Sequence, residues 1–196
     1  MNFLNALSNP LTDKNWTLFL DRDGVINVES VGSYITSWEE FVFHDGVLEI
    51  MPLLSRIFGK IIVVSNQRGV GRGIMTFEAL KDINSKMTNT VSLYGGRIDK
   101  IYSCIAVSDD DHNRKPNSGM ALQAQQDYPE INFKKSIMVG NAFTDMEFGR
   151  RLSMHTVFLT TKHAGDSLPD ELADEYFDSL FSWAQSLQMA NIPAAS

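Results

Sequence analysis

The 196-residue chain lacks the residues that build disulfide and zinc frameworks, because Cys104 is its single cysteine. One cysteine excludes an intramolecular disulfide and a cysteine-rich zinc site. No apolar run approaches the ~20 residues that a membrane span needs. The first residues also lack the basic and long apolar regions of a secretory signal, so we expect a cytoplasmic protein with no membrane partner.

Positive charge is also scarce. The chain has 17 Lys and Arg residues against 24 Asp and Glu residues, which gives a formal net charge of −7. Binding along nucleic acid requires an excess of basic residues, so the composition argues against nucleic acid as the main partner. It leaves open a single phosphate held in a local pocket.

Hydrophobic residues make up 43% of the chain and charged residues 21%, as in an ordinary globular protein. The length and the lack of repeats predict one domain over residues 1–196, with its core at about 16–190 and a monomer as the favoured state. Several short apolar runs are typical of strands buried on both faces of a parallel sheet. They are Trp16–Leu20, Lys60–Ser65, Ile101–Val107, Ser136–Gly140 and His155–Leu159.

Helical patterns between these runs predict an α/β fold with a doubly wound, mainly parallel sheet. Thr76 is placed to cap one helix, and a C-terminal helix is predicted to start near Phe177. Asp45–Phe58 also has helical spacing, and Pro52 inside it predicts a kink or a late start. Val25–Val42, rich in β-forming residues and glycine, predicts a small hairpin or flap.

The strongest chemical signal is a pair of acids, Asp21 and Asp23, directly after the first apolar run. Ligands of open α/β sheets bind at the carboxyl ends of strands, so both carboxylates are expected at the mouth of a site. Their mutual repulsion favours a cation between them or a proton on one of them. A solvated Asp-Gly turn is the alternative explanation.

Three further polar groups follow later apolar runs. Ser65–Gly73 combines a hydroxyl, three glycines and two arginines, which suits an anion-binding loop but also a flexible surface loop. Arg114–Pro116 places a lysine beside a rigid proline, as a phosphate site or a plain turn would. Asn141 and Asp145 follow the fourth run, with Asp145 near the first turn of a helix. Acids, hydroxyl, lysine and acid in this order predict a Mg²⁺-assisted phosphoryl-transfer site.

These motifs resemble those of the haloacid dehalogenase (HAD) superfamily of phosphohydrolases. The segments DRDGVIN, FHDGV, SNQRGVGRG, RKPNSGM and VGNAFTDM are similar to the subfamily that contains heptose bisphosphate phosphatases and the histidinol-phosphatase domain. The resemblance covers roughly residues 17–159, most of the chain, and implies a HAD-like, Rossmann-like fold.

The resemblance implies that Asp21 is a nucleophile that forms an aspartyl-phosphate. It implies that Asp23 is the general acid and then the base, with its protonated form favoured first. Ser65 and the amides around Asn66 would hold the phosphoryl oxygens, and Lys115 would neutralise them.

The resemblance also implies a Mg²⁺ ion and a substrate that carries phosphate. The implied metal ligands are Asp21, Asp23 through its backbone carbonyl, Asn141 and Asp145. The implied substrate-binding residues are Asn66, Gln67, Arg68, Arg72 and Arg114, with the arginines as candidates to hold a second, non-reacting phosphate.

Two departures from the family pattern weaken parts of this interpretation. The family usually has Asp where this chain has Asn141, so one negative charge is lost from the metal site. Many subfamily members carry a Cys/His zinc loop before the lysine motif, whereas this chain has only Cys104 there, so no zinc is expected. His112 with Asp109–Asp111 could bind a metal, but a solvated acidic loop is favoured.

The intervals between the motifs leave no room for a cap domain, so the site should be open. Tyr34 and Trp38 in the flap could pack against a sugar or a base, or anchor the flap to the core. We predict a Mg²⁺-dependent phosphomonoesterase for a small phosphorylated metabolite, with a sugar bisphosphate such as D,D-heptose 1,7-bisphosphate as the leading substrate. The alternatives are a catalytically weakened phospholigand-binding relative and a polynucleotide 3′-phosphatase.

Overall fold

Six parallel strands form the sheet of the computed structural model, which describes residues 14–30, 32–161, 171 and 173–190. Their order across the sheet is β3-β2-β1-β4-β5-β6. The strands are β1 (Thr17–Leu20), β2 (Lys60–Asn66), β3 (Lys100–Cys104), β4 (Ser136–Gly140), β5 (His155–Leu159) and β6 (Glu175–Phe177). From β1 the chain builds outward to β2 and β3, then returns to β4 on the other side. The prediction of a doubly wound parallel sheet is therefore confirmed.

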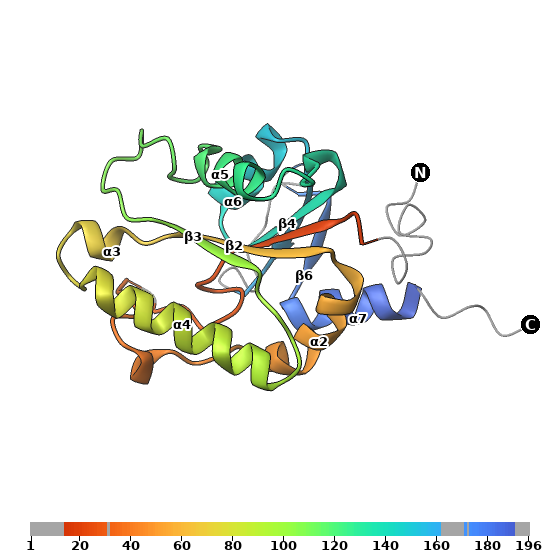
Figure 1. Cartoon of the computed structure of the whole chain (residues 1–196), viewed down its shortest axis with the longest axis horizontal. Helices are drawn as coiled ribbons and strands as arrows, with labels where there is room; N and C mark the ends of the chain where they lie inside the picture. The colour runs from red at the N-terminus through yellow and green to blue at the C-terminus, as the bar shows by residue number, and fades with distance from the viewer. Residues whose placement is uncertain (1–13, 31, 162–170, 172, 191–196) are drawn as a thin grey trace, which may run out of the picture.

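Helices cover both faces of this sheet (Figure 1). One face carries α2 (Val47–Ile57), α4 (Phe77–Leu93) and α7 (Leu180–Ala190). The other carries α5 (Gly119–Asp127) and α6 (Phe143–Arg151). Successive strand residues point to opposite faces, which is why neighbouring apolar residues in one strand enter different clusters. In β1, for example, Leu18 and Leu20 pack with the first group of helices and Phe19 packs with the second.

Several sequence predictions for the helices are confirmed. The Thr76 hydroxyl accepts a hydrogen bond from the Ala79 amide at 3.0 Å and caps α4. The helix around Pro52 runs from Val47 to Ile57, so the proline lies inside it and does not delay its start. The segment after Arg114–Pro116 also forms a helix, α5, for which Ser118 is the N-cap.

Other boundaries were wrong. β3 ends at Cys104 rather than at Val107, because the chain leaves the sheet there and exposes Ile105 and Val107. Phe177 belongs to β6, a short edge strand that the sequence did not predict, and the C-terminal helix begins only at Leu180. Arg68–Gly71 in the glycine-containing loop forms a single helical turn, α3.

The flap between β1 and α2 lacks the expected hairpin. Its described residues form two isolated bridges, Asp23 with Asn27 and Asn27 with Phe43, and one short 3₁₀ helix, η1 (Trp38–Glu40). Trp38 stacks on Phe41 with ring centroids 5.0 Å apart, so this tryptophan anchors the flap to the core. The flap is thus held by side-chain packing together with a short antiparallel pairing, in which the Val28 amide donates to the Val42 carbonyl at 2.8 Å and the His44 amide donates to the Ile26 carbonyl at 3.0 Å.

Within the described ranges, the segments between the strands form the helices and loops named above, and the expected absence of a cap domain stays a prediction. None of the helices in the described ranges has the length and apolar character needed to cross a bilayer. The predicted extent of one domain over residues 1–196 includes parts outside the described ranges and stays a prediction. His163, interpreted from the sequence as a loop residue, also lies outside them.

The α4 cap generates a direct test of the fold. Replacing Thr76 with Ala should lower the free energy of unfolding by about 1 kcal/mol, because the Ala79 amide loses its acceptor. Urea denaturation followed by circular dichroism measures this change. Thr76→Ser keeps the oxygen and should retain most of the stability. Equal losses in both variants would show that the methyl group, and not the cap, is what matters.

Candidate active site

The predicted site residues meet at the carboxyl ends of the central strands. Asp21 follows β1 and donates its amide to the Val139 carbonyl of β4 at 3.0 Å, which fixes the position of Asp21 between the two strands. This is the point where the chain order reverses across the sheet, the usual place for a ligand in such folds. A cavity of about 170 Å³ opens there. Its lining is Asp21, Asp23, Glu29, Ser65, Asn66, Lys115, Asn141, Ala142, Thr144 and Asp145.

Lys115 is buried at the centre of this cavity and connects three elements. Its Nζ lies 2.8 Å from Asp21 Oδ1 and 2.7 Å from Asp145 Oδ1, and donates to the Val64 carbonyl at 2.8 Å. Burial alone would lower the pKa of Lys115, but the carboxylates of Asp145 and Asp21 outweigh it and raise that pKa. Lys115 is therefore a fixed positive charge beside the predicted nucleophile.

The surroundings of Asp21 disfavour the ionised form of its carboxyl group. Burial raises its pKa from 3.8 to about 7, although the neighbouring lysine acts in the opposite direction. The nearby carboxylates of Asp145 and Asp23 add to the increase. The positive charge of Lys115 therefore does not balance the negative charges of these carboxylates. A further cation in contact with Asp21 would favour its ionised, nucleophilic form.

Asp23 is held in the opposite state. Its Oδ1 accepts hydrogen bonds from Arg22 Nη2 at 2.9 Å and Asn27 Nδ2 at 3.1 Å, and its Oδ2 accepts one from Gln67 Nε2 at 2.7 Å. Burial would raise the pKa of Asp23, but the Arg22 charge and these three donors lower it below its ordinary value. Asp23 is therefore held ionised in the free protein, and the expectation that the neighbouring charge and a bound phosphate favour its protonated form stays a prediction.

Arg22 is a functional residue that sequence reasoning missed. Its side chain is only 1% exposed. Its Nη1 donates to Asn84 Oδ1 of α4 at 3.3 Å, and its guanidinium carbon lies 6.0 Å from the centre of the Phe41 ring. Its position in the sequence, between Asp21 and Asp23, does not indicate that its side chain is buried. Arg22 supplies the buried positive charge that keeps Asp23 ionised.

Asn66 and Gln67 were predicted to bind substrate, but their side chains are engaged with the protein. The Asn66 amide donates to the Lys115 carbonyl at 3.1 Å and accepts from the Lys115 amide at 3.0 Å. Gln67 Nε2 donates to Ser65 Oγ and Asp23 Oδ2, both at 2.7 Å. Both residues therefore position groups that the sequence predicted to be catalytic, and the Ser65 hydroxyl is buried in the lining of the cavity.

The three arginines lie outside the cavity lining. Arg72 Nη1 donates to the Tyr34 hydroxyl at 3.1 Å, which joins the loop after β2 to the flap. Arg68 and Arg114 both pair with the exposed carboxylate of Asp109. These arginines stand at the rim, where they could contact the distal part of a ligand.

Asn141 and Asp145 play different parts. Asp145 Oδ2 accepts from the Ala142 amide at 3.0 Å, and its other oxygen pairs with Lys115, so both oxygens are already engaged.

Asn141 is buried beside Gly24, where an added Cβ would come 1.9 Å from Asn141 Nδ2. Gly24 also has φ +85°, which makes glycine necessary there. Glu29, which the sequence did not single out, lies 3.5 Å from Asn141 Nδ2 through its Oε1.

The donor set suits Mg²⁺, which takes oxygen ligands and is usually held by one or two carboxylates together with substrate phosphate and water. Asp21, the Asp23 carbonyl and Asn141 offer such oxygens around one cavity. Within the described ranges, no group of three or more His, Cys, Asp or Glu side chains could hold a metal. In the loop before Lys115, Asp111 accepts from the Asn113 amide at 2.8 Å and so structures the turn. The prediction of no zinc stays a prediction.

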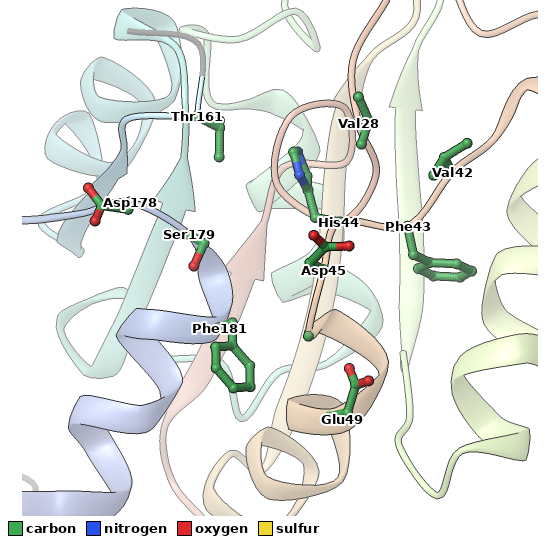
Figure 2. Close-up of a pocket in the computed structure, with 11 residues that line it drawn as sticks. Val28, Val42, Phe43, His44, Asp45, Glu49, Thr161, Asp178, Ser179 and Phe181 are labelled. Carbon is green, nitrogen blue, oxygen red and sulfur yellow. The ribbon is translucent and has the colours of Figure 1, made fainter. Parts of the chain in front are cut away.

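Smaller hollows extend the site under the flap. A cavity of about 160 Å³ adjoins Asp23 and Gln67 and is lined on its flap side by Ser30, Ser33 and Tyr34. Tyr34 thus faces the site, whereas Trp38 is an anchor of the flap. A larger cavity of about 600 Å³ lies elsewhere, between the end of the flap, α2 and α7 (Figure 2). None of the predicted catalytic residues lines this larger cavity.

Comparison with known proteins decides the family. A family model described as polynucleotide kinase 3 phosphatase matches residues 18–189. The chain belongs to this family. It is 31% identical over 182 residues to D-glycero-D-manno-heptose-1,7-bisphosphate 7-phosphatase of Chlorobaculum tepidum, covering 83% of this chain and 91% of that protein. It is 34% identical to D-glycero-alpha-D-manno-heptose-1,7-bisphosphate 7-phosphatase of Burkholderia mallei, covering 74% and 80%.

The fold of this phosphatase also matches solved structures. D,D-heptose 1,7-bisphosphate phosphatase from B. bronchiseptica, solved with magnesium and phosphate, superposes with a TM-score of 0.78 at 24% identity. The match covers 89% of this chain and 98% of that one. The predicted membership of the HAD phosphatases is confirmed, and with it the class of phosphoric monoester hydrolases.

The raised pKa of Asp21 predicts a stability change with a definite sign. A folded pKa of about 7 against 3.8 means that stability from this group is present below about pH 4 and is lost as the pH rises through 7. Asp21→Asn should therefore raise the free energy of unfolding of the metal-free phosphatase by about 1–3 kcal/mol at pH 8. Urea denaturation in EDTA at pH 4, 6 and 8 measures the difference, which should vanish near pH 4.

Asp23→Asn is the matched control for this measurement. The lowered pKa of Asp23 gives the opposite sign, with stability present above its ordinary pKa and lost in acid. That variant should be destabilised at pH 8. A loss of stability in the Asp21 variant at pH 8 would contradict the conclusion that Asp21 is an undercompensated buried charge.

The environment of Asn141 generates a second prediction. Asn141→Asp should strengthen Mg²⁺ binding about tenfold, because it restores a carboxylate to the proposed ligand set. The gain should be larger in a Glu29→Gln background, since Glu29 Oε1 would otherwise face the new charge from the present 3.5 Å. Isothermal titration with Mg²⁺ measures all four proteins. Equal affinities with Asn and Asp in both backgrounds would remove residue 141 from the metal site.

Proposed function

We propose that this phosphatase is a Mg²⁺-dependent phosphomonoesterase that acts through an aspartyl-phosphate on a sugar bisphosphate. The observation that carries the proposal is the pairing of buried Asp21 with Lys115 at 2.8 Å, in one cavity with Ser65 and Asp23. A carboxylate nucleophile, a fixed cation, a hydroxyl donor and a second carboxyl are the parts that phosphoryl transfer needs.

In the proposed reaction, an Asp21 carboxylate oxygen forms a bond to phosphorus as the bond from phosphorus to the leaving oxygen breaks. The leaving oxygen takes a proton from the Asp23 carboxyl. Water then attacks the aspartyl-phosphate, Asp23 accepts its proton, and Asp21 is released with inorganic phosphate. Ser65 and Lys115 stabilise the charge on the phosphoryl oxygens during both steps.

Asp23 must gain a proton before the first step, although its donors hold it ionised in the free protein. A phosphomonoester has a second pKa of about 6, so its monoanion can bring a proton into the site. Gln67 Nε2 donates to both Asp23 Oδ2 and Ser65 Oγ, which leaves the Ser65 hydroxyl hydrogen able to donate to a phosphoryl oxygen. In this proposal the proton of Asp23 therefore arrives with the substrate.

The residues present fit a Mg²⁺ ion held by Asp21, the Asp23 carbonyl and Asn141, with Asp145 acting through water or through Lys115. The ion would neutralise charge on the transferring phosphoryl group and favour the ionised form of Asp21. The heptose bisphosphate phosphatase of the same fold that was solved with magnesium and phosphate supports this assignment.

The proposed substrate follows from the shape and the relatives of the site. The hollow beside Asp23 is lined by hydroxyls of Ser30, Ser33 and Tyr34, which suit a sugar, and the rim carries arginines that suit a second phosphate. The curated relatives are named for heptose 1,7-bisphosphate. D,D-heptose 1,7-bisphosphate is therefore the first substrate to test.

Two other functions have an observation in their favour. Asn141 replaces a charged ligand, which favours a phospholigand-binding protein with weakened turnover; a sharp gain of activity in Asn141→Asp would support it. The family description favours a polynucleotide 3′-phosphatase. The net charge of −7 and the acidic residues Asp109–Asp111 at the rim oppose this second option.

The test is phosphate release from a panel of substrates with Mg²⁺ and with EDTA. The panel contains D-glycero-D-manno-heptose 1,7-bisphosphate, sugar monophosphates and an oligonucleotide that ends in a 3′-phosphate. We expect Mg²⁺-dependent turnover that is highest on the bisphosphate, and a loss of at least about 10³-fold in Asp21→Asn, because the nucleophile is removed.

Each other outcome has a clear meaning. Absence of turnover on every substrate, with Asp21→Asn no different from the native protein, would overturn the enzymatic proposal. Preference for the oligonucleotide, with binding that weakens steeply as salt rises, would replace the sugar substrate with a nucleic-acid end.

A further inference from the structure

The arginines at the rim of the site already hold an anion that belongs to the chain. Asp109 Oδ1 accepts hydrogen bonds from Arg68 Nη2 and, at 3.0 Å, from Arg114 Nε. One carboxylate oxygen thus accepts hydrogen bonds from two guanidinium groups. The Asp109 side chain is 82% exposed, whereas those of Arg68 and Arg114 are 21% and 13% exposed. The arginines are set into the surface and the carboxylate covers them from the solvent side.

This cluster is tied closely to the catalytic residues. Arg114 directly precedes Lys115, and Arg68 directly follows Gln67, which bonds Asp23 and Ser65. The paired hydrogen bonds between the Asn66 side chain and the Lys115 backbone hold these two segments together. The two arginines therefore belong to segments that the same contacts hold beside the cavity.

The charges of the cluster favour exchange of one anion for another. Two positive groups face one negative group, so a net positive charge remains. The hydrogen bond from Arg114 and the charge of Arg68 lower the pKa of Asp109, so its carboxylate is ionised at neutral pH. Carboxylate and phosphate bind arginine through the same N–H donors, but a phosphate brings more charge and more acceptor oxygens. An exposed ion pair also contributes little stability, so its displacement costs little.

We propose that the Asp109 carboxylate occupies the binding position of the second, non-reacting phosphate of the substrate. When a bisphosphate binds, its second phosphate displaces this carboxylate from the two arginines. This inference rests on the proposed function at the same site and adds to it an internal anion that competes with the substrate. A dianionic phosphate can displace the carboxylate, whereas a neutral group at the same end of the substrate cannot. Asp109 therefore lowers the affinity of the two arginines for the second phosphate and leaves substrates without that phosphate almost unaffected.

The alternative is that Asp109 is a support that holds the two arginines in place for the substrate. The two roles predict opposite effects. If Asp109 competes with the phosphate, its removal strengthens binding of the second phosphate; if it supports the arginines, its removal weakens that binding.

The experiment compares Asp109→Asn with Asp110→Asn. The two variants remove the same charge from neighbouring positions of one loop. In the described part of the chain, the Asp110 carboxylate is not among the groups that contact Arg68 or Arg114. The probes are D-glycero-D-manno-heptose 1,7-bisphosphate and the 7-phosphate, which lacks the phosphate at position 1. KM is measured for both, and binding of heptose 1-phosphate is measured by titration calorimetry.

We expect Asp109→Asn to lower KM for the bisphosphate and Kd for heptose 1-phosphate by about three- to tenfold, with much less change for the 7-phosphate. Asp110→Asn should shift both substrates alike and only slightly. Raised or unchanged values for the bisphosphate in Asp109→Asn, or equal effects of the two variants, would overturn the inference. The calorimetric arm needs no turnover, so tighter binding without hydrolysis would uphold the role of Asp109 while the proposed function fails.

Discussion

The ion pairs of Lys115 are the constraint on which the rest of the site depends. Its Nζ lies within 2.8 Å of both Asp21 and Asp145, which stand after β1 and after β4. Removing Lys115 would leave two buried carboxylates without a counter-charge, whereas without Asp21 the lysine would still pair with Asp145. This set of three side chains holds three separate segments of chain in register at the edge of the sheet. The surrounding hydrogen bonds of Asn66 and Ala142 fix its members further.

Two carboxyl groups only two residues apart are held in opposite states by their partners. Asp21 is surrounded by other carboxylates and one lysine, which leaves its pKa raised to about 7. Asp23 receives three donors, including the guanidinium of Arg22, which lowers its pKa. Both states have to change before the proposed reaction can begin. Asp21 is poised to gain a cation, and Asp23 has to exchange a hydrogen bond for a proton before it can act as an acid.

The parts of the fold that follow from local pattern were predictable. Continuous apolar runs gave five of the strands, and residues after the strand ends necessarily converge in a parallel sheet, which is why Asp21, Ser65, Lys115 and Asn141 meet. The inward turn of Arg22 was not predictable, because its partners Asn84 and Phe41 are distant in sequence. β6 was missed because an edge strand of three residues carries almost no periodicity. The flap pairs only at residues 26–28 and 42–44 and is held also by aromatic packing, which the alternation of residue types does not reveal.

The flap is nonetheless what gives an uncapped site a boundary. Glu29 lines the catalytic cavity and also the two hollows under the flap, so one side chain faces every space that a substrate could enter there. Tyr34 and its bond to Arg72 close the far side against the loop after β2. An open site lined by charged side chains does not enclose its ligand. It selects ligands by the positions of their anionic groups relative to those side chains. In the proposed recognition, the negative charge of Asp109 is therefore as much a part of the site as the arginines, because the second phosphate has to displace it.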